Sequence, residues 1–377
     1  VAAKPSTVAA PIAVTRPQAT TLAQPQTGIV AAGKSAGTAT GLGRPSTDME
    51  GVWNGPDMPG EMVGVAVVDL DGDGVVETVS AFTNKVLIGS LAGGQYKGQG
   101  FIDIPKRTRL VGIDAADLDG NGRPELYISA VKLDISRDIE VVASLVAEEV
   151  NGQYRIIADD IPYFLRRVDI PWEETVIAAQ RAADTERTYG GKVYRLQRQG
   201  DDFDNGAEID FGTGKLTANG FLPIQSDDQR VVVLFDINER LEVVKLTGKK
   251  IWDSDEVLGG SSAYILREDP NARGDKLKYY LKANLDRMPD GTILVPVNKG
   301  DDGMFSSKVF SESLLAGLVW DGDSLEEAWH TDPKGGYLAD FQVADVDNDD
   351  RDEIVTALVR GIGDDLVQSK LVVYELP

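Results

Sequence analysis

The chain contains no cysteine and a single histidine, His330, among its 377 residues. The absence of cysteine excludes disulfides, thiolate metal sites and covalent c-type haem attachment, and zinc is not expected because its sites use mostly histidine and cysteine. A lone histidine next to Trp329 gives no Ser–His–Asp or Cys–His arrangement for nucleophilic catalysis. Carboxylates are plentiful, but 61 acidic residues single out no glycosidase-like pair. The sequence therefore predicts no catalytic residue and a non-enzymatic protein.

Long apolar runs and a balanced charge are missing as well. No stretch approaches the ~20 apolar residues of a membrane helix, so no membrane span is expected. The formal net charge is −23, although residues 1–47 contain no acid. This excess of negative charge on residues 48–377 repels nucleic acid and anionic membrane surfaces and attracts cations. Nucleic acid is therefore not an expected partner.

Residues 1–47 form a region of their own, rich in Ala, Thr, Pro, Gln and Gly and without aromatic residues. Such a segment cannot bury enough surface to fold alone, so we expect an extended N-terminal arm. Two arrangements remain open: the arm packs along its own chain, or it adds a strand to a neighbouring subunit. The start at Val1 is typical of a mature N-terminus after signal-peptide removal, which predicts a secreted or cell-surface protein.

Three short acidic runs share one sequence pattern: residues 69–77, 117–125 and 345–353. Each places oxygen-bearing side chains at positions 1, 3 and 5 and a glutamate at position 9. Calcium takes roughly six to eight oxygens, and alternate residues of a tight loop can aim their carboxylates at one point. The backbone carbonyl of position 7 can add another oxygen. The predicted ligands are Asp69, Asp71, Asp73, Val75 and Glu77 in the first loop, Asp117, Asp119, Asn121, Arg123 and Glu125 in the second, and Asp345, Asp347, Asp349, Arg351 and Glu353 in the third.

The flanks of these loops indicate strands, whereas an EF-hand carries its glutamate at position 12 between two helices. Residues 63–68 and 75–82 flank the first loop and are rich in Val and Ala. Three copies at the same point of a strand pattern favour metal binding over three acidic turns without metal, so up to three structural Ca²⁺ ions are predicted. The second loop has Asn121 in place of a carboxylate, and we expect it to bind calcium most weakly.

These Asp-x-Asp-x-Asp/Asn-Gly runs, each with a carboxylate at position 9 and an apolar strand on either side, resemble the FG-GAP or VCBS repeats of integrin-alpha-like β-propellers. The resemblance covers roughly residues 50–377 and is carried by the three loops. It implies that each calcium loop joins the first two strands of a blade and has a structural role.

After residue 48 the chain reads as short β-rich runs separated by Gly, Asp and Asn turns. Loop positions recur roughly every 48–64 residues, the size of a four-stranded propeller blade. We therefore predict an all-β protein with a six-bladed β-propeller over residues 48–377. Seven blades are the alternative, because blades three to five lack the complete loop. The predicted blades begin near Val63, Leu110, Phe164, Asn219, Lys278 and Leu338.

A repeated tryptophan indicates how the ring closes. Trp53, Trp252 and Trp329 each precede the first strand of a blade, where an outermost strand is expected. Blade six has only three strands of its own. We therefore expect residues 51–54 to supply its fourth strand by pairing with residues 369–376. Closure removes two exposed sheet edges, which otherwise favour aggregation.

Two classes of function are compatible with such a ring. The first is an extracellular binding or assembly protein, a subunit of a surface polymer or complex. Its partners are other protein chains, including copies of itself held through residues 1–47. The second is a secreted propeller that binds or cleaves carbohydrate, with an extracellular polysaccharide as its partner. Contacts between the arm and a second chain favour the first class, and an aromatic and acidic pocket on one face favours the second.

Overall fold

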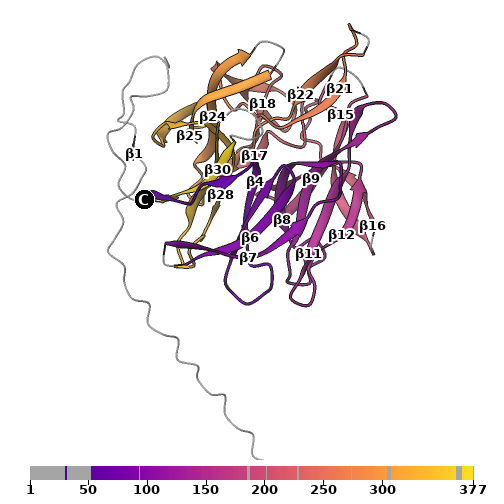
Figure 1. Ribbon diagram of the computed structural model, residues 1–377. Helices are drawn as coiled ribbons and strands as arrows, with labels where there is room; N and C mark the ends of the chain where they lie inside the picture. Colours follow the sequence, from indigo (N-terminus) through magenta and orange to yellow (C-terminus); the bar gives the residue numbers. More distant parts are fainter. Residues whose placement is uncertain are drawn as a thin grey trace, which may run out of the picture.

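The computed structural model describes residues 30–31, 52–92, 94–184, 187–200, 202–226, 229–272, 274–303, 307–361 and 367–376. Within these ranges the chain is built from strands and turns, and no helix is long or apolar enough to cross a membrane. Six small antiparallel sheets of the described chain stand in a ring and form a six-bladed β-propeller (Figure 1). The predicted fold is confirmed. The predicted arm, residues 1–47, lies outside the described residues except for Val30–Ala31.

The first four blades follow one another along the chain, and in blades one, three and four the strands pair in sequence order. Blade one contains β4 (Met62–Val68), β5 (Glu77–Phe82), β6 (Lys85–Ala92) and β7 (Gln95–Asp103). Blade two contains β8 (Thr108–Ala116), β9 (Glu125–Asp134), β10 (Ile139–Val142) and β11 (Ser144–Glu149), which both pair with β9, and β12 (Tyr154–Ile161). Blade three contains β13 (Phe164–Asp169), β14 (Thr175–Ala182), β15 (Tyr189–Gln199) and β16 (Asp202–Glu208). Blade four contains β17 (Phe221–Ser226), β18 (Gln229–Phe235), β19 (Arg240–Lys245) and β20 (Lys250–Val257).

The last two blades recruit strands from the N-terminal part of the chain. Blade five contains β23 (Asp286–Arg287), β24 (Ile293–Gly303), β25 (Ser307–Trp320) and β26 (Leu325–His330), with β27 (Lys334–Gly335) on β25 and β1 (Val30–Ala31) on β26. Blade six contains β28 (Tyr337–Ala344), β29 (Glu353–Arg360), β30 (Gln368–Glu375) and β2 (Val52–Asn54), with β3 (Met58–Pro59) also on β30.

Burial follows the position of each strand within its blade. All six residues of β5 are buried, because other strands flank it in its sheet and apolar side chains cover both of its faces. The outermost strand β7 is mostly exposed and correspondingly polar. Apolar clusters lie between adjacent blades; one of them joins Val65 of blade one to Val355 and Leu371 of blade six. The stability of the ring therefore depends on contacts between blades as well as within them.

The first and last strands of the ring lie in the same sheet. β2 pairs antiparallel with β30 over three residues, with Trp53 opposite Val373. The indole Nε1 of Trp53 donates a hydrogen bond to the carbonyl oxygen of Gly94 at 2.8 Å, which ties the closing strand to blade one. Trp252 lies in the outermost strand β20, and Trp329 lies in β26, the fourth strand of blade five, whose outer edge pairs with β1. The three tryptophans therefore occupy the fourth strands of their blades, although β1 lies outside the one in blade five.

The predicted start of blade five near Lys278 is wrong. Lys278 lies in β22 (Lys276–Tyr280), which pairs with β21 (Tyr264–Glu268) in a hairpin separate from the six ring sheets. The hairpin packs on blade two, where the amide of Leu266 donates to Glu140 Oε2 at 2.8 Å. Its short runs of apolar, aromatic and basic residues are compatible with any half-buried antiparallel strand, so the local sequence does not distinguish a hairpin of this kind from a blade.

Candidate metal sites

The three acidic loops lie on one face of the ring, because each follows the inner strand of its blade. The first joins β4 to β5, the second joins β8 to β9, and the third joins β28 to β29. In each case the glutamate at position 9 is the first residue of the second strand, which fixes its backbone. The first and third loops are in contact: the amide of Val76 donates to Asn348 Oδ1 at 2.8 Å.

All three loops have the same backbone turn. The residues at positions 4 and 6 have positive φ; they are Gly72, Gly74, Gly120, Gly122, Asn348 and Asp350. The amide at position 6 donates to the aspartate at position 1 at 2.8–2.9 Å. The amide at position 2 donates to the glutamate at position 9 at 2.8–3.1 Å. These hydrogen bonds within each loop orient its first and last carboxylates without the help of a ligand.

In the third loop three carboxylates converge. Oxygen atoms of Asp345, Asp347 and Glu353 all lie within 4.8 Å of one another. Glu353 is only 1% exposed, and its Oε1 has no hydrogen-bond partner among the described residues. Asp347 Oδ1 is buried and equally without a partner there. Buried charges without partners are costly, so this arrangement is suited to a cation.

The first loop has the same convergence. Oxygen atoms of Asp69, Asp71 and Glu77 lie within 4.8 Å of one another. Glu77 is 2% exposed, and its Oε2 accepts the amide of Leu70 at 2.9 Å. Two of the three predicted sites therefore bring the carboxylates of positions 1, 3 and 9 together.

The second loop differs from the other two, and no comparable carboxylate group forms there among the described residues. Its position-3 and position-9 carboxylates instead contact a guanidinium group from blade three. Arg198 Nη1 lies 2.9 Å from Asp119 Oδ2 and 2.5 Å from Glu125 Oε1. Sequence reasoning did not find Arg198, because it lies far along the chain and outside any loop motif.

The remaining predicted ligands have other observed contacts. Side chains at position 5 accept hydrogen bonds from the amide at position 7 at 2.7–3.0 Å; these acceptors are Asp73, Asn121 and Asp349. These hydrogen bonds fix the backbone amides of the position-7 residues, which are Val75, Arg123 and Arg351. Arg123 also uses its side chain, which forms an ion pair with Glu149 of blade two at 2.9 Å.

The glutamates at position 9 of the first and third loops have strongly raised pKa values. Burial raises the pKa of Glu77 to about 7, with a smaller contribution from the neighbouring aspartates, while the backbone hydrogen bond from Leu70 opposes the rise. Burial likewise raises the pKa of Glu353 to about 8. Both shifts arise mainly because burial disfavours the charged carboxylate, and a bound cation would favour that charged form.

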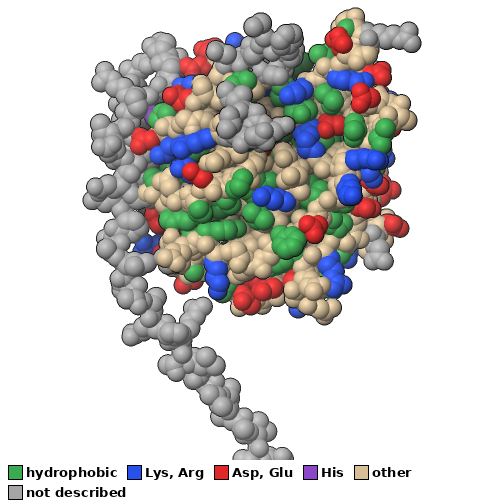
Figure 2. All heavy atoms as spheres, viewed as in Figure 1, with side chains coloured by type: hydrophobic (Ala, Val, Ile, Leu, Met, Phe, Trp, Pro, Cys, Tyr) green, Lys and Arg blue, Asp and Glu red, His purple; other side chains and the backbone are tan. Residues whose placement is uncertain are grey.

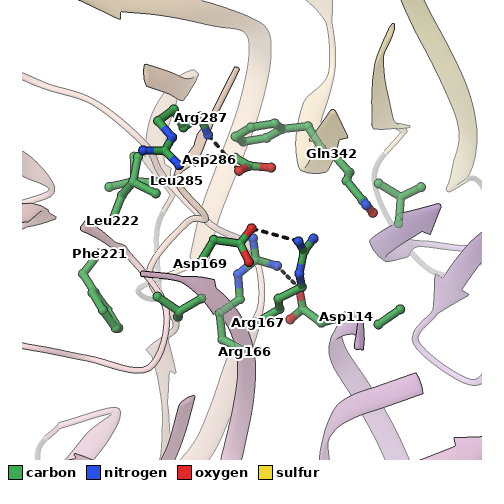
Figure 3. Close-up of a pocket in the computed structure, with 14 residues that line it drawn as sticks. Asp114, Arg166, Arg167, Asp169, Phe221, Leu222, Leu285, Asp286, Arg287 and Gln342 are labelled. Atoms are coloured by element: carbon green, nitrogen blue, oxygen red, sulfur yellow. Dashed lines mark hydrogen bonds and ion pairs between the residues drawn. The ribbon is translucent and has the colours of Figure 1, made fainter. Parts of the chain in front are cut away.

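Inner strands of the six blades line a cavity of about 60 Å³ at the centre of the ring (Figure 3). Four of its charged side chains form ion pairs: Arg166 with Asp114, and Arg167 with Asp169 at 2.8 Å. Next to this cavity, a chain of hydrogen bonds crosses from blade to blade. Asn219 Nδ2 donates to Asn284 Oδ1 at 3.2 Å, Asn284 Nδ2 donates to Asp340 Oδ1 at 2.5 Å, and the amide of Val65 donates to Asp340 Oδ2 at 3.1 Å.

A second cavity of about 500 Å³ opens on the loop-bearing face. Asp117 and Asp345, the first residues of the second and third loops, line it together with Arg167. No aromatic side chain is among the described residues that line it. On the face seen in Figure 2, acidic and basic side chains are interspersed with apolar ones. The wider cavity thus lacks the aromatic surface expected of a saccharide pocket.

No protein-family model matches the chain, and no curated protein sequence matches it. Solved structures resemble it at a distance. The crystal structure of BBS1N in complex with ARL6DN, soaked with lead, is 11% identical, with 86% of this chain and 97% of that chain covered and a TM-score of 0.43. A glucose dehydrogenase is also 11% identical, with 86% and 99% covered and a TM-score of 0.45. Both structures are too distant to support a conclusion about the acidic loops.

Proposed function

We propose that the protein is a non-enzymatic, calcium-binding β-propeller of the FG-GAP or VCBS type that serves in extracellular binding or assembly. One observation carries the calcium proposal: Asp345, Asp347 and Glu353 converge around a buried, unpartnered carboxylate oxygen. The only histidine, His330, lies outside the cavities described above and contacts Glu327 at 2.8 Å, which supports a role without histidine chemistry.

The donor set favours calcium over other cations. All available side-chain donors in the first and third loops are oxygens, which excludes the sulfur and nitrogen donors preferred by zinc and copper. Carboxylates at alternate positions of a turn fit the irregular coordination of Ca²⁺ better than the strict octahedron of Mg²⁺. The ions are proposed to be structural, because each would link the end of an inner strand to the start of the next.

Calcium binding is tested by thermal unfolding with calcium and with a chelator. A cation that binds only the folded state stabilises it by mass action, about 2.7 kcal/mol at a concentration 100 times the Kd. We expect Asp71→Ala and Asp347→Ala each to reduce the stabilisation that calcium gives. Asp352→Ala is the matched control, since it removes one exposed charge from the third loop without removing a predicted ligand. Identical melting with calcium and with chelator would refute the proposal.

Assembly through the arm is supported by the pairing of β1. Val30 and Ala31 pair antiparallel with His330 and Trp329 of β26, so the outer edge of blade five accepts a strand from the arm. We propose that this edge is where the arm attaches, within one chain or between copies. Light scattering over a concentration series tests the exchange between copies. A double proline substitution at Val30 and Ala31 should abolish any concentration-dependent rise in mass, whereas one at Ala36 and Gly37 should not.

A further inference from the structure

We propose that Arg198 is a built-in counter-ion that occupies the second acidic loop in place of calcium, so that the chain binds two calcium ions and not three. This inference rests on the proposed calcium binding of the first and third loops. On this proposal, Arg198 prevents one of three loops with a similar sequence from binding a metal ion.

The guanidinium group lies where a cation would be coordinated. Arg198 Nη1 contacts Asp119 Oδ2 at 2.9 Å and Glu125 Oε1 at 2.5 Å, which are side-chain oxygens of positions 3 and 9. Glu148 Oε2 of the adjacent strand β11 lies 3.7 Å from the same nitrogen. One nitrogen atom is thus within ion-pair distance of three carboxylates, the role proposed for the metal in the other loops.

The carboxylate at position 9 has no free oxygen in this loop. Glu125 is fully buried, and its Oε1 contacts Arg198. Its Oε2 accepts the amide of Leu118 at 3.1 Å and the hydroxyl of Tyr127 at 3.0 Å. In the third loop, by contrast, the equivalent Glu353 keeps one buried oxygen without a partner among the described residues. Both oxygens of the position-9 carboxylate are therefore partnered in the second loop, whereas one in the third loop has no partner among the described residues.

Arg198 is held in this position by its own strand and by aromatic packing. Its side chain is 19% exposed, and its Nε donates to the carbonyl oxygen of Gly200 at 3.1 Å. The guanidinium carbon lies 5.6 Å from the centre of the Phe203 ring, and this ring packs edge-on against Tyr127. A cation entering the loop must displace a positive charge that is already bonded and partly desolvated.

The position of Arg198 in the second loop also links two blades. Arg198 lies near the end of β15 in blade three, whereas Asp119 and Glu125 belong to blade two. The ion pairs thus join two blades directly, and they do so whether or not calcium is present. Charge-assisted bonds of this kind to a buried carboxylate are among the stronger side-chain contacts.

The test is the number of calcium ions bound per chain, measured by equilibrium dialysis with metal analysis. We expect two for the wild type and three for Arg198→Ala, because removal of the guanidinium frees the carboxylates of Asp119 and Glu125. Arg195→Ala is the matched control: Arg195 lies on the same strand but pairs with Glu173 and Glu174, so this variant should bind two.

The outcomes separate the inference from the function on which it rests. Three ions on the wild type, or two on a folded Arg198→Ala, would overturn the role of Arg198 and leave calcium binding intact. No ion on the wild type would overturn both. If Arg198→Ala does not fold, Asp119→Asn in the wild-type background decides: two ions support the inference, and a loss of one ion relative to the wild type overturns it.

Discussion

The glutamates at position 9 have the same backbone setting but different partners for their second carboxylate oxygen. Glu125 meets Arg198, whereas Oε1 of Glu353 meets no described partner. Both side chains are almost completely buried. At the scale of single residues, loops with the same sequence pattern therefore place their position-9 carboxylates in different electrostatic surroundings.

Glu353→Gln and Glu125→Gln make the same chemical change and should have opposite effects. In chelator, Glu353→Gln should raise the unfolding temperature, since it removes a carboxyl group whose charged form burial disfavours, while the new amide oxygen can still accept the Val346 amide. Its stabilisation by calcium should be largely lost. Glu125→Gln leaves Arg198 without its closest partner and should lower the unfolding free energy by about 3 kcal/mol with or without calcium. Equal effects of the two variants would contradict the assigned environments.

Asp114 in the central cavity should make stability depend on pH. Burial raises its pKa from the ordinary 3.8 to about 7, although Arg166 opposes the rise. Between these two values the folded state binds more protons than the unfolded state, so the unfolding free energy falls as pH rises. Asp114→Asn removes this contribution. Urea unfolding at pH 4 and pH 8 should show the variant gaining on the wild type as pH rises, and a constant difference would contradict the shift.

At the scale of elements, repetition determined what could be predicted. The acidic loops, the strands beside them and the tryptophan-bearing outer strands recur, so comparison within one sequence was enough to place them. The hairpin β21–β22 has no counterpart in the other blades, and its residues are compatible with an ordinary blade strand, so the sequence alone does not separate it from the start of blade five. Arg198 and the Asn219–Asn284–Asp340 chain were not predicted, because they arise from contacts between blades that no local pattern encodes.

The attachment of this hairpin to blade two depends on Glu140. Its carboxylate accepts two bonds from Arg109, at 3.0 and 2.6 Å, as well as the amide of Leu266. Glu140→Ala leaves these donors unsatisfied in a half-buried setting and should cost about 2–3 kcal/mol in urea unfolding. Lys132→Ala is the control, because it breaks the exposed Lys132–Asp160 pair and should cost about 0.5 kcal/mol or less. Similar costs for both variants would show that the hairpin is not anchored there.

At the scale of the whole molecule, six blades share their stability through a closed ring. Trp53 of the closing strand packs against the apolar cluster between blades one and six and bonds to Gly94. The hydrogen bonds from Asn219 to Asp340 and Val65 add a polar link through blades four, five, six and one. A substitution at the seam, the pairing of β2 with β30 that closes the ring, should therefore destabilise the entire propeller.

Trp53→Ala should lower the free energy of unfolding by about 3 kcal/mol, because it removes a large packed side chain from β2, the fourth strand of blade six. The loss should appear as one cooperative transition at lower urea concentration. Val257→Ala is a control on another outermost strand; its side chain is 60% exposed and should matter little. An unchanged midpoint for Trp53→Ala would show that the seam contributes little to stability.

The seam also sets an order of events during synthesis. Asn54 and Lys370 share a hydrogen bond although they are 316 positions apart in the chain. A ribosome therefore releases β2 long before β30 exists, and during that interval β2 has no sheet to join. Blades two to four can fold as they emerge, but closure waits for the distant strand and bears the entropy of a very long loop. A nascent chain stalled before residue 368 should hence expose an open sheet edge that chaperones or other nascent copies can bind.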